Sequence, residues 1–214
     1  MVKGKIMMQF ALIVSTLSLM PLSQIEPGYK WAAMAYGDEI EFAVRRKGKI
    51  IGKHTVSFKN TNDIFYVNSQ TKLRVKFLFF TAYRFSYEVT ETWNGQQLVA
   101  VEGSTNDGGD KTHVNQYFDT DNTPVPTNHW NPYVLKQTKV FNTITGNMNS
   151  VTITAGDWEE VSTGTGMRYA QRYDYSGDLQ NVSSWYDTQN RWVGLKFLGG
   201  DGSEIIYECI KCGS

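Results

Sequence analysis

The sequence predicts an all-β fold: a single curled antiparallel meander sheet, or half-barrel, of about ten to twelve strands with one short helix across its concave face. Three observations lead to this prediction. After Asp38, apolar and aromatic residues alternate with polar residues along most of the chain. Short turn sequences such as Asn94-Gly95 and Gly108-Gly109 separate the alternating runs. Between residues 119 and 142 the alternation stops, and Pro132 there fits the first turn of a short helix.

The N-terminal residues are typical of a secretory signal peptide. Two lysines stand among the first five residues, an uncharged apolar run extends from Ile6 to Leu22, and Ala33-Met34-Ala35 supplies small residues for cleavage. The apolar run is shorter than the ~20 residues that a membrane-spanning helix needs. The sequence therefore predicts a signal peptide at residues 1–35 and a single antiparallel β domain at 36–214. We expect an exported protein, periplasmic or secreted, that keeps no transmembrane segment.

Composition excludes several classes of partner and fold. The 214 residues carry 21 basic and 21 acidic side chains, and removal of the leader leaves 18 and 20. This balance gives no electrostatic reason to expect a nucleic acid as partner. The only two cysteines are Cys209 and Cys212, so no disulfide framework supports the fold. Their spacing leaves open a local disulfide in the C-terminal tail or two free thiols.

Turn chemistry assigns the first hairpin. A type I turn with Gly48 in the left-handed region would pair Val44 with Ile50 and Ile40 with His54. This register gathers the apolar residues of both strands, together with His54, on one face. A slip by one residue would scatter them over both faces.

The same reasoning assigns the central strands. If Asn94-Gly95 is a two-residue loop, Trp93 faces Gln96 and Tyr87 faces Glu102. If Gly108-Gly109 is another, His113 faces Ser104. The outcome is an aromatic inner face in which ionisable groups are embedded.

Ionisable groups on an apolar face are paired, solvated in a cavity or functional. We expect a non-catalytic binder or carrier of an apolar or amphipathic ligand, such as a lipid, with no cofactor. The segment from Trp130 onward would close the concavity over that ligand. The predicted ligand-binding residues are His54, Tyr83, Phe85, Tyr87, Glu91, Trp93, Glu102, His113 and Trp130.

Catalytic and metal-binding arrangements fit the sequence less well. In the predicted register Glu91 and Glu102 lie about 13 Å apart, beyond the roughly 5 to 9.5 Å of glycosidase carboxylate pairs. A hydrolase could use His113 and Glu102 beside Ser104, but this serine lies within a strand and not at a tight elbow. The three histidines show no metal-binding spacing. An envelope assembly protein that pairs through a sheet edge remains the main alternative to a ligand carrier.

Several stretches together resemble one family. They are Gly48-Lys49-Ile50-Ile51-Gly52-Lys53-His54, Lys76 to Tyr87, Asp107 to Val114, Trp130-Asn131-Pro132 and Arg191 to Leu195. Their order and spacing resemble an uncharacterised family of exported bacterial proteins catalogued as domain of unknown function 6134, over essentially the whole mature chain. Members often have His-Pro after the Trp, where this chain has Asn131-Pro132. The family has no assigned activity, so the resemblance implies no catalytic residues. More distantly, the strand pattern is similar to the curled sheets of periplasmic lipoprotein carriers, which hold acyl chains.

Overall fold

Twelve strands form one antiparallel sheet in the structure, a computed structural model that describes residues 29–62, 64–77, 80–119 and 123–213. The strands are β1 (Glu39–Arg46), β2 (Lys49–Thr61), β3 (Ile64–Phe77), β4 (Phe80–Asn94), β5 (Gln97–Asp107), β6 (Asp110–Tyr117), β7 (Lys139–Phe141), β8 (Met148–Thr163), β9 (Gly166–Gly177), β10 (Val182–Asp187), β11 (Trp192–Leu198) and β12 (Glu204–Lys211). Helix α1 (Tyr29–Tyr36) precedes them, and the 3-10 helix η2 (Pro132–Lys136) follows β6.

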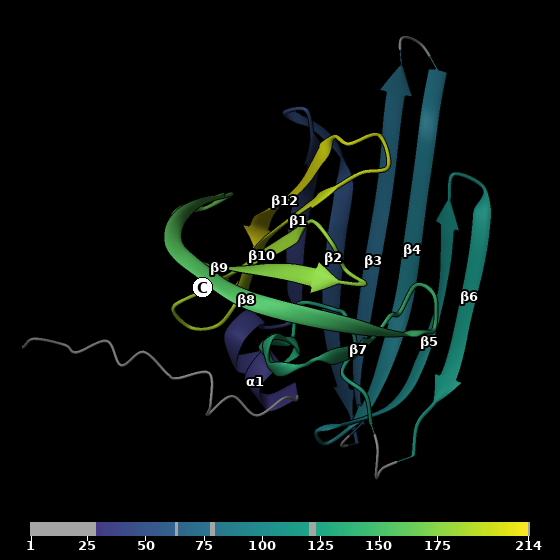
Figure 1. Cartoon of the computed structure of the whole chain (residues 1–214). Coiled ribbons are helices and arrows are strands. Elements are labelled where there is room, and N and C mark those ends of the chain that lie inside the picture. The colour runs from purple at the N-terminus through teal and green to yellow at the C-terminus, as the bar shows by residue number, and fades with distance from the viewer. Residues whose placement is uncertain (1–28, 63, 78–79, 120–122, 214) are drawn as a thin grey trace, which may run out of the picture.

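The order of strands across the sheet is β6-β5-β4-β3-β2-β1-β12-β11-β10-β9-β8-β7. Each strand lies beside its sequence neighbours, except that β1 pairs with β12 while β6 and β7 form the two edges. The sheet curls around an interior without closing into a barrel (Figure 1). One side-chain hydrogen bond connects the two edges of the sheet: the hydroxyl of Thr112 in β6 donates to the carbonyl of Ile144, just after β7, at 2.9 Å. The predicted curled antiparallel meander is confirmed.

The β1–β2 hairpin differs from the predicted register. Lys47 and Gly48 have φ of 48° and 74°, so both central residues of a two-residue loop lie in the left-handed region. An irregularity next to Val44 then places it opposite Gly52, and Phe42 opposite His54. The predicted Val44–Ile50 pair is therefore wrong. The shift is by two residues, however, so His54 keeps its place on the inner face.

The β4–β5 hairpin also differs from the predicted register, and this difference changes which residues lie on the inner face. Its loop is Gly95-Gln96, and a bulge follows, so that Tyr87 faces Thr105 and not Glu102. This odd shift turns Glu102 to the outer face, where it is exposed. The predicted Gly108-Gly109 loop is confirmed, and Ser104 does face His113. Ser104 and His113, however, lie on the exposed outer face with Glu102.

Aromatic rings dominate the interior. Trp130, from the segment between β6 and β7, is 1 % exposed and meets Phe58, Phe65 and Trp93 edge-on at 5.6 to 5.9 Å. Trp192 of β11 lies 4.2 Å from Phe42, measured between ring centroids. These rings fill one end of the curled sheet.

Helix α1 packs against this filled end (Figure 1). Ala32 is fully buried and Tyr36 is 3 % exposed. The Tyr36 hydroxyl donates to the Trp130 carbonyl at 3.2 Å and accepts from the Trp192 N–H at 2.8 Å. Most of the predicted signal peptide, residues 1–28, lies outside the described residues.

The C-terminal tail carries the disulfide that the cysteine spacing left open. Cys209 and Cys212 are bonded, with their Cα atoms 6.1 Å apart. Among the described residues, no helix has the length and apolar character that crossing a membrane requires.

Candidate functional site

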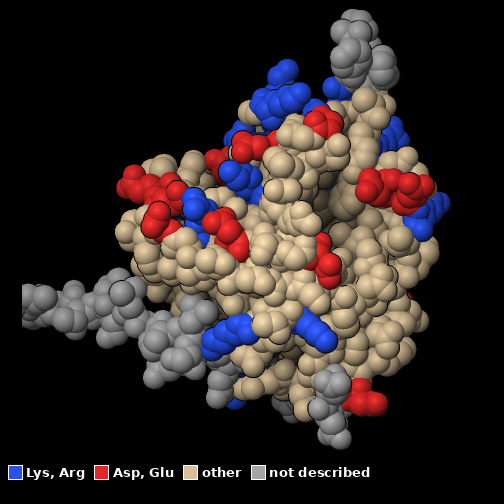
Figure 2. Space-filling view, in the orientation of Figure 1, with Lys and Arg blue, Asp and Glu red and all other residues tan. Residues whose placement is uncertain are grey.

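A cavity of about 760 Å³ occupies the other end of the interior. Its inner boundary is formed by His129, Trp130 and Trp192, and its rim by residues near the turns after β1, β5 and β11: Arg46, Asp107 and Asp201. The surface is hollowed below the projecting ends of β3 and β4 (Figure 2). The cavity therefore opens at the end of the sheet opposite α1.

The walls of the cavity are mainly apolar. Strands β2, β3, β4, β10, β11 and β12 each contribute apolar side chains from their inner faces. These are Ile51, Val56, Leu73, Val75, Phe85, Val182, Leu195, Phe197 and Ile205, joined by Leu179 from the β9–β10 turn and by Leu198 at the end of β11.

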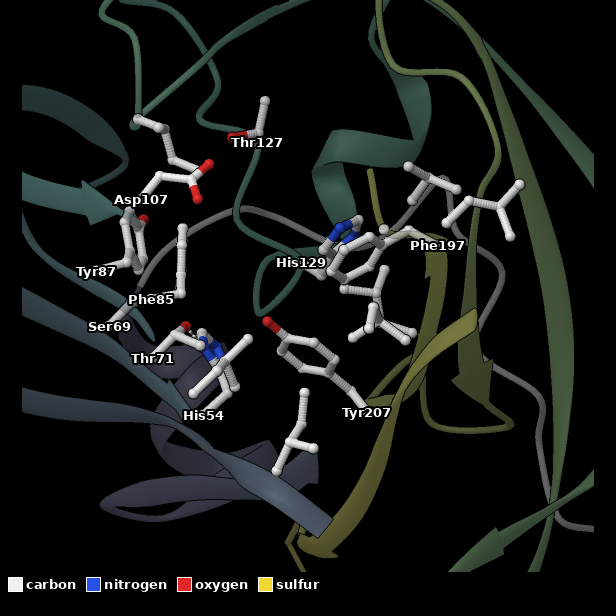
Figure 3. Close-up of a pocket in the computed structure, with 18 of the residues that line it drawn as sticks. His54, Ser69, Thr71, Phe85, Tyr87, Asp107, Thr127, His129, Phe197 and Tyr207 are labelled. Atoms are coloured by element: carbon white, nitrogen blue, oxygen red, sulfur yellow. Dashed lines mark hydrogen bonds between the residues drawn. The ribbon is translucent and has the colours of Figure 1, made fainter. Parts of the chain in front are cut away.

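A polar cluster interrupts one wall. His54 Nδ1 lies 2.7 Å from the Thr71 hydroxyl oxygen, and the Tyr207 ring lies 5.4 Å from the His54 ring. Figure 3 shows the Tyr207 hydroxyl pointing into the space between His54 and His129. Burial lowers the pKa of His54 to about 3, with a smaller contribution from His129, and burial raises the pKa of Tyr207 to about 12. At pH 7 these groups are neutral hydrogen-bonding partners.

His129 supplies a second polar group from the segment before η2. Its Nδ1 lies 3.3 Å from the Tyr175 hydroxyl, and its ring lies 5.3 Å from the Trp192 ring. Burial lowers the pKa of His129 to about 4. Both histidines that line the cavity are therefore uncharged imidazoles at neutral pH.

Ser69 is the one cavity-lining side chain whose buried polar atom has no hydrogen-bond partner among the described residues. It is fully buried on β3, two residues from Thr71. An unpaired buried hydroxyl costs roughly 1–3 kcal/mol. A ligand that hydrogen-bonds to Ser69 would remove that cost.

Glu91 lies behind the cavity wall and holds part of it. Its carboxylate accepts hydrogen bonds from Trp93 Nε1 at 2.9 Å, from Trp130 Nε1 at 3.3 Å and from Asn128 Nδ2. Burial raises the pKa of Glu91 to about 7, although these three N–H donors lower it. Since Asn128 and Trp130 line the cavity, Glu91 positions the segment that bounds its inner end.

With this geometry in view, residues 42–210 match the model of the family described as Domain of unknown function (DUF6134). The chain belongs to this family. No curated protein matches the DUF6134 chain in sequence. A similar solved structure is the beta-barrel-like protein of domain of unknown function DUF1849 from Brucella abortus, with a TM-score of 0.51. It is 10 % identical, and the alignment covers 84 % of this chain and 97 % of that chain. At this identity the likeness concerns the fold alone.

The structure brings five of the predicted ligand-binding residues of this DUF6134 protein to the cavity: His54, Tyr83, Phe85, Tyr87 and Trp130. Glu91 and Trp93 are buried in the core behind it. Glu102 and His113 are exposed on the outer face, so their predicted position beside the cavity is wrong. The β4–β5 bulge is the reason.

Other lining groups were missed by the sequence prediction. Ser69 and Thr71 interrupt the apolar inner face of β3, and that break in an otherwise apolar alternation was a usable signal. Tyr207 alternates with Ile205 and Cys209 like an ordinary core residue. His129 lies in a segment without periodicity, so only the fold places it at the cavity.

The described residues contain no group of three or more His, Cys, Asp or Glu side chains that could hold a metal ion. Ser104 and His113 do face each other, but on an exposed part of the outer face. The cavity, with its apolar walls and neutral polar groups, is suited to holding a ligand.

Proposed function

We propose that this DUF6134 protein is a non-catalytic binder or carrier of an apolar or amphipathic ligand in the cell envelope, and that the ligand occupies the cavity between His54 and His129. The observation that carries the proposal is the cavity itself. Its volume of about 760 Å³ falls within the roughly 300–1,000 Å³ of small-molecule sites. Apolar walls with a few convergent polar groups are the usual lining of such sites.

The polar groups narrow the chemistry of the ligand. His54 and His129 are uncharged at neutral pH, and Tyr207, Thr71 and Ser69 offer hydroxyls. Arg46, the cation at the rim, is paired with Asp201. The inner end therefore suits a neutral hydrogen-bonding group, and the walls suit an apolar chain.

Ligand retention can be tested directly. Native mass spectrometry and solvent extraction of the purified protein should identify a bound amphipath. After its removal, cis-parinaric acid should bind and palmitic acid should displace it. Leu73→Trp, which fills the cavity from β3, should weaken probe binding at least about tenfold, or 1.4 kcal/mol.

The matched control is Glu88→Trp, which adds the same ring on the exposed outer face of β4. It should leave probe affinity unchanged. Equal affinities for the two variants, or no bound probe at all, would contradict the proposal.

Export is part of the same proposal. The lysines, the apolar run and the small residues of the leader support it, as does a disulfide at Cys209–Cys212, which is typical of oxidising compartments. Residues 1–35 fused to alkaline phosphatase should give an enzyme that is active outside the cytoplasm. Leu12→Arg with Val14→Arg should abolish that activity, whereas Ser23→Arg with Gln24→Arg, beyond the apolar run, should not.

A second candidate, assembly through a sheet edge, is supported by β6. Every residue of this edge strand except Val114 is exposed. The Asp107–Asp110 pair closes the turn and is hydrogen-bonded, and hydrogen-bonded pairs alternate with non-hydrogen-bonded pairs along an antiparallel ladder. Asn115 falls in a non-hydrogen-bonded pair, so its N–H points away from β5. Asn115→Pro should therefore abolish any concentration-dependent association in sedimentation velocity while leaving the sheet intact. A monomer at all concentrations would exclude this candidate.

A further inference from the structure

The outer face of the β3–β4 hairpin carries a row of exposed cations. Strands β3 and β4 are 14 and 15 residues long, and their paired ends project beyond the rest of the sheet (Figure 1). Lys72, Arg74, Lys76 and Arg84 alternate along this projection on the side away from the cavity, and all four are exposed. Lys and Arg side chains flank the top of the projection in Figure 2.

Three of these four cations lie opposite like charges in the sheet. The sheet register places Arg74 directly opposite Arg84, and Lys72 directly opposite Lys53. Like charges in directly opposed positions destabilise a sheet. Within the described part of the chain, none of the four cations on the projection takes part in an ion pair, whereas Arg45, Arg172 and Lys196 each have a carboxylate partner. The arrangement leaves a concentrated positive charge that an anionic partner would neutralise.

A hollow of about 510 Å³ lies among these side chains. Lys72, Arg74 and Arg84 line it, together with Ser86 and Asn106. The Oδ1 atom of Asn106 already accepts from the Gly109 N–H at 2.9 Å, so the group that Asn106 can still offer is its amide donor. Three cations with hydroxyl and amide donors match the chemistry of a phosphate group.

The inner face of the same two strands forms part of the cavity mouth. Leu73, Val75 and Tyr83 line the cavity, and each alternates with one of the cations. The projecting hairpin is therefore charged on one face and apolar on the other. The acidic groups at this end are Asp107 and Asp110, which flank the β5–β6 turn, and Asp201, which is paired with Arg46 at the cavity rim. Asp107 accepts a hydrogen bond from the Tyr83 hydroxyl at 2.6 Å.

We propose that the outer face of the β3–β4 hairpin docks on an anionic phospholipid bilayer, with lipid phosphates entering the hollow between Lys72, Arg74 and Arg84. A bilayer fits better than an acidic protein because the charged face adjoins the mouth of an apolar cavity. Docked in this way, the protein presents that mouth to the source of an amphipathic ligand. Docking on the bilayer does not itself depend on the proposed ligand binding, but the passage of a lipid into the cavity does.

Vesicle sedimentation tests the docking surface with the full mature chain. The protein should bind vesicles of phosphatidylcholine with about 30 % phosphatidylglycerol and should not bind phosphatidylcholine alone. Raising the salt to about 0.5 M should release it. Lys72→Gln with Lys76→Gln should weaken binding roughly 30-fold, at about fivefold for each lysine near the surface. Adding Arg74→Gln and Arg84→Gln should abolish it.

The matched control is Lys59→Gln with Lys139→Gln, which removes two exposed lysines away from the projection. This control should bind anionic vesicles like the unaltered protein. Thermal melting should show that the Gln variants stay folded, because removing opposed like charges relieves repulsion. Equal binding to neutral vesicles, equal loss in both lysine pairs, or binding to an acidic protein in place of vesicles would overturn the proposal.

Retention of cis-parinaric acid by the same variants separates the two proposals. Normal retention with no vesicle binding in the unaltered protein overturns only the docking surface. Normal vesicle binding with no retention overturns only the ligand cavity. Leu195→Trp should lose retention while still binding anionic vesicles, since Leu195 lines the cavity and not the hollow.

Discussion

At the scale of single residues, Glu91 makes stability depend on pH. Burial raises the pKa of its carboxyl from 4.5 to about 7, so the folded protein holds this proton more tightly than the unfolded chain does. The contribution of Glu91 to the free energy of unfolding is complete below pH 4.5 and is lost as the pH rises through 7. The loss amounts to about 3 kcal/mol.

Glu91→Gln should remove this pH-dependent contribution. Urea unfolding between pH 4.5 and about 8 measures it. The difference between the unaltered protein and the variant should shrink by about 3 kcal/mol across the window as the pH rises. Glu102→Gln, on the exposed outer face, is the control and should not alter the profile. An identical profile for Glu91→Gln would mean that its carboxyl is not the buried acid described above.

Ser69 allows stability and binding to be separated. Its buried hydroxyl has no partner among the described residues, so Ser69→Ala should stabilise the ligand-free protein by about 1 kcal/mol. The same substitution should weaken a ligand that hydrogen-bonds there. In Ser69→Ala the melting temperature of the ligand-free protein should therefore rise while the affinity for the probe falls. Ser184→Ala, which removes a hydroxyl bonded to Tyr175 at 3.3 Å, should only destabilise.

At the scale of elements, α1 extends the folded unit into the predicted leader. Ala32 and Tyr36 are buried against the core, and cleavage after Ala35 would remove Ala32 from that contact. A chain that begins at Tyr36 should therefore unfold at a lower temperature than one that begins at Tyr29, with a loss of roughly 2–4 kcal/mol. Differential scanning calorimetry of the two chains measures this. Equal melting temperatures would show that α1 contributes nothing to stability.

How far the elements could be predicted depends on where bulges lie. Alternation and turn residues predicted the strands, and Gly108-Gly109 gave the β5–β6 register correctly. A single bulge after Gly95-Gln96 reversed the facing of Glu102 and His113. The bulge leaves both Leu98 and Val101 fully buried. Burial of this kind depends on the assembled sheet, so the local sequence did not predict the bulge. Two of the nine predicted ligand-binding residues, Glu102 and His113, were displaced for this reason.

At the scale of the whole molecule, the curl of the sheet buries opposing ionisable groups in one interior. Burial lowers the pKa of His54 and His129 from 6.5 to about 3 and about 4. Their contribution to stability is complete above pH 6.5 and is lost as the pH falls through those lowered values. Glu91 acts in the opposite direction between pH 4.5 and about 7.

These opposing groups predict a stability maximum near pH 7, where the histidines are mostly neutral in both the folded and the unfolded state and most of the Glu91 contribution has already been lost. Between pH 6.5 and 4.5 two histidines oppose one carboxyl, so the free energy of unfolding should fall by about 1.4 kcal/mol per pH unit on acidification. His129→Gln should leave only His54 to oppose Glu91, so the free energy of unfolding should change little with pH in this window. Glu91→Gln should leave both histidines unopposed and steepen it to about 2.7 kcal/mol per unit. Urea unfolding at intervals across the window measures all three slopes, and a flat profile in the unaltered protein would contradict the burial of the two histidines.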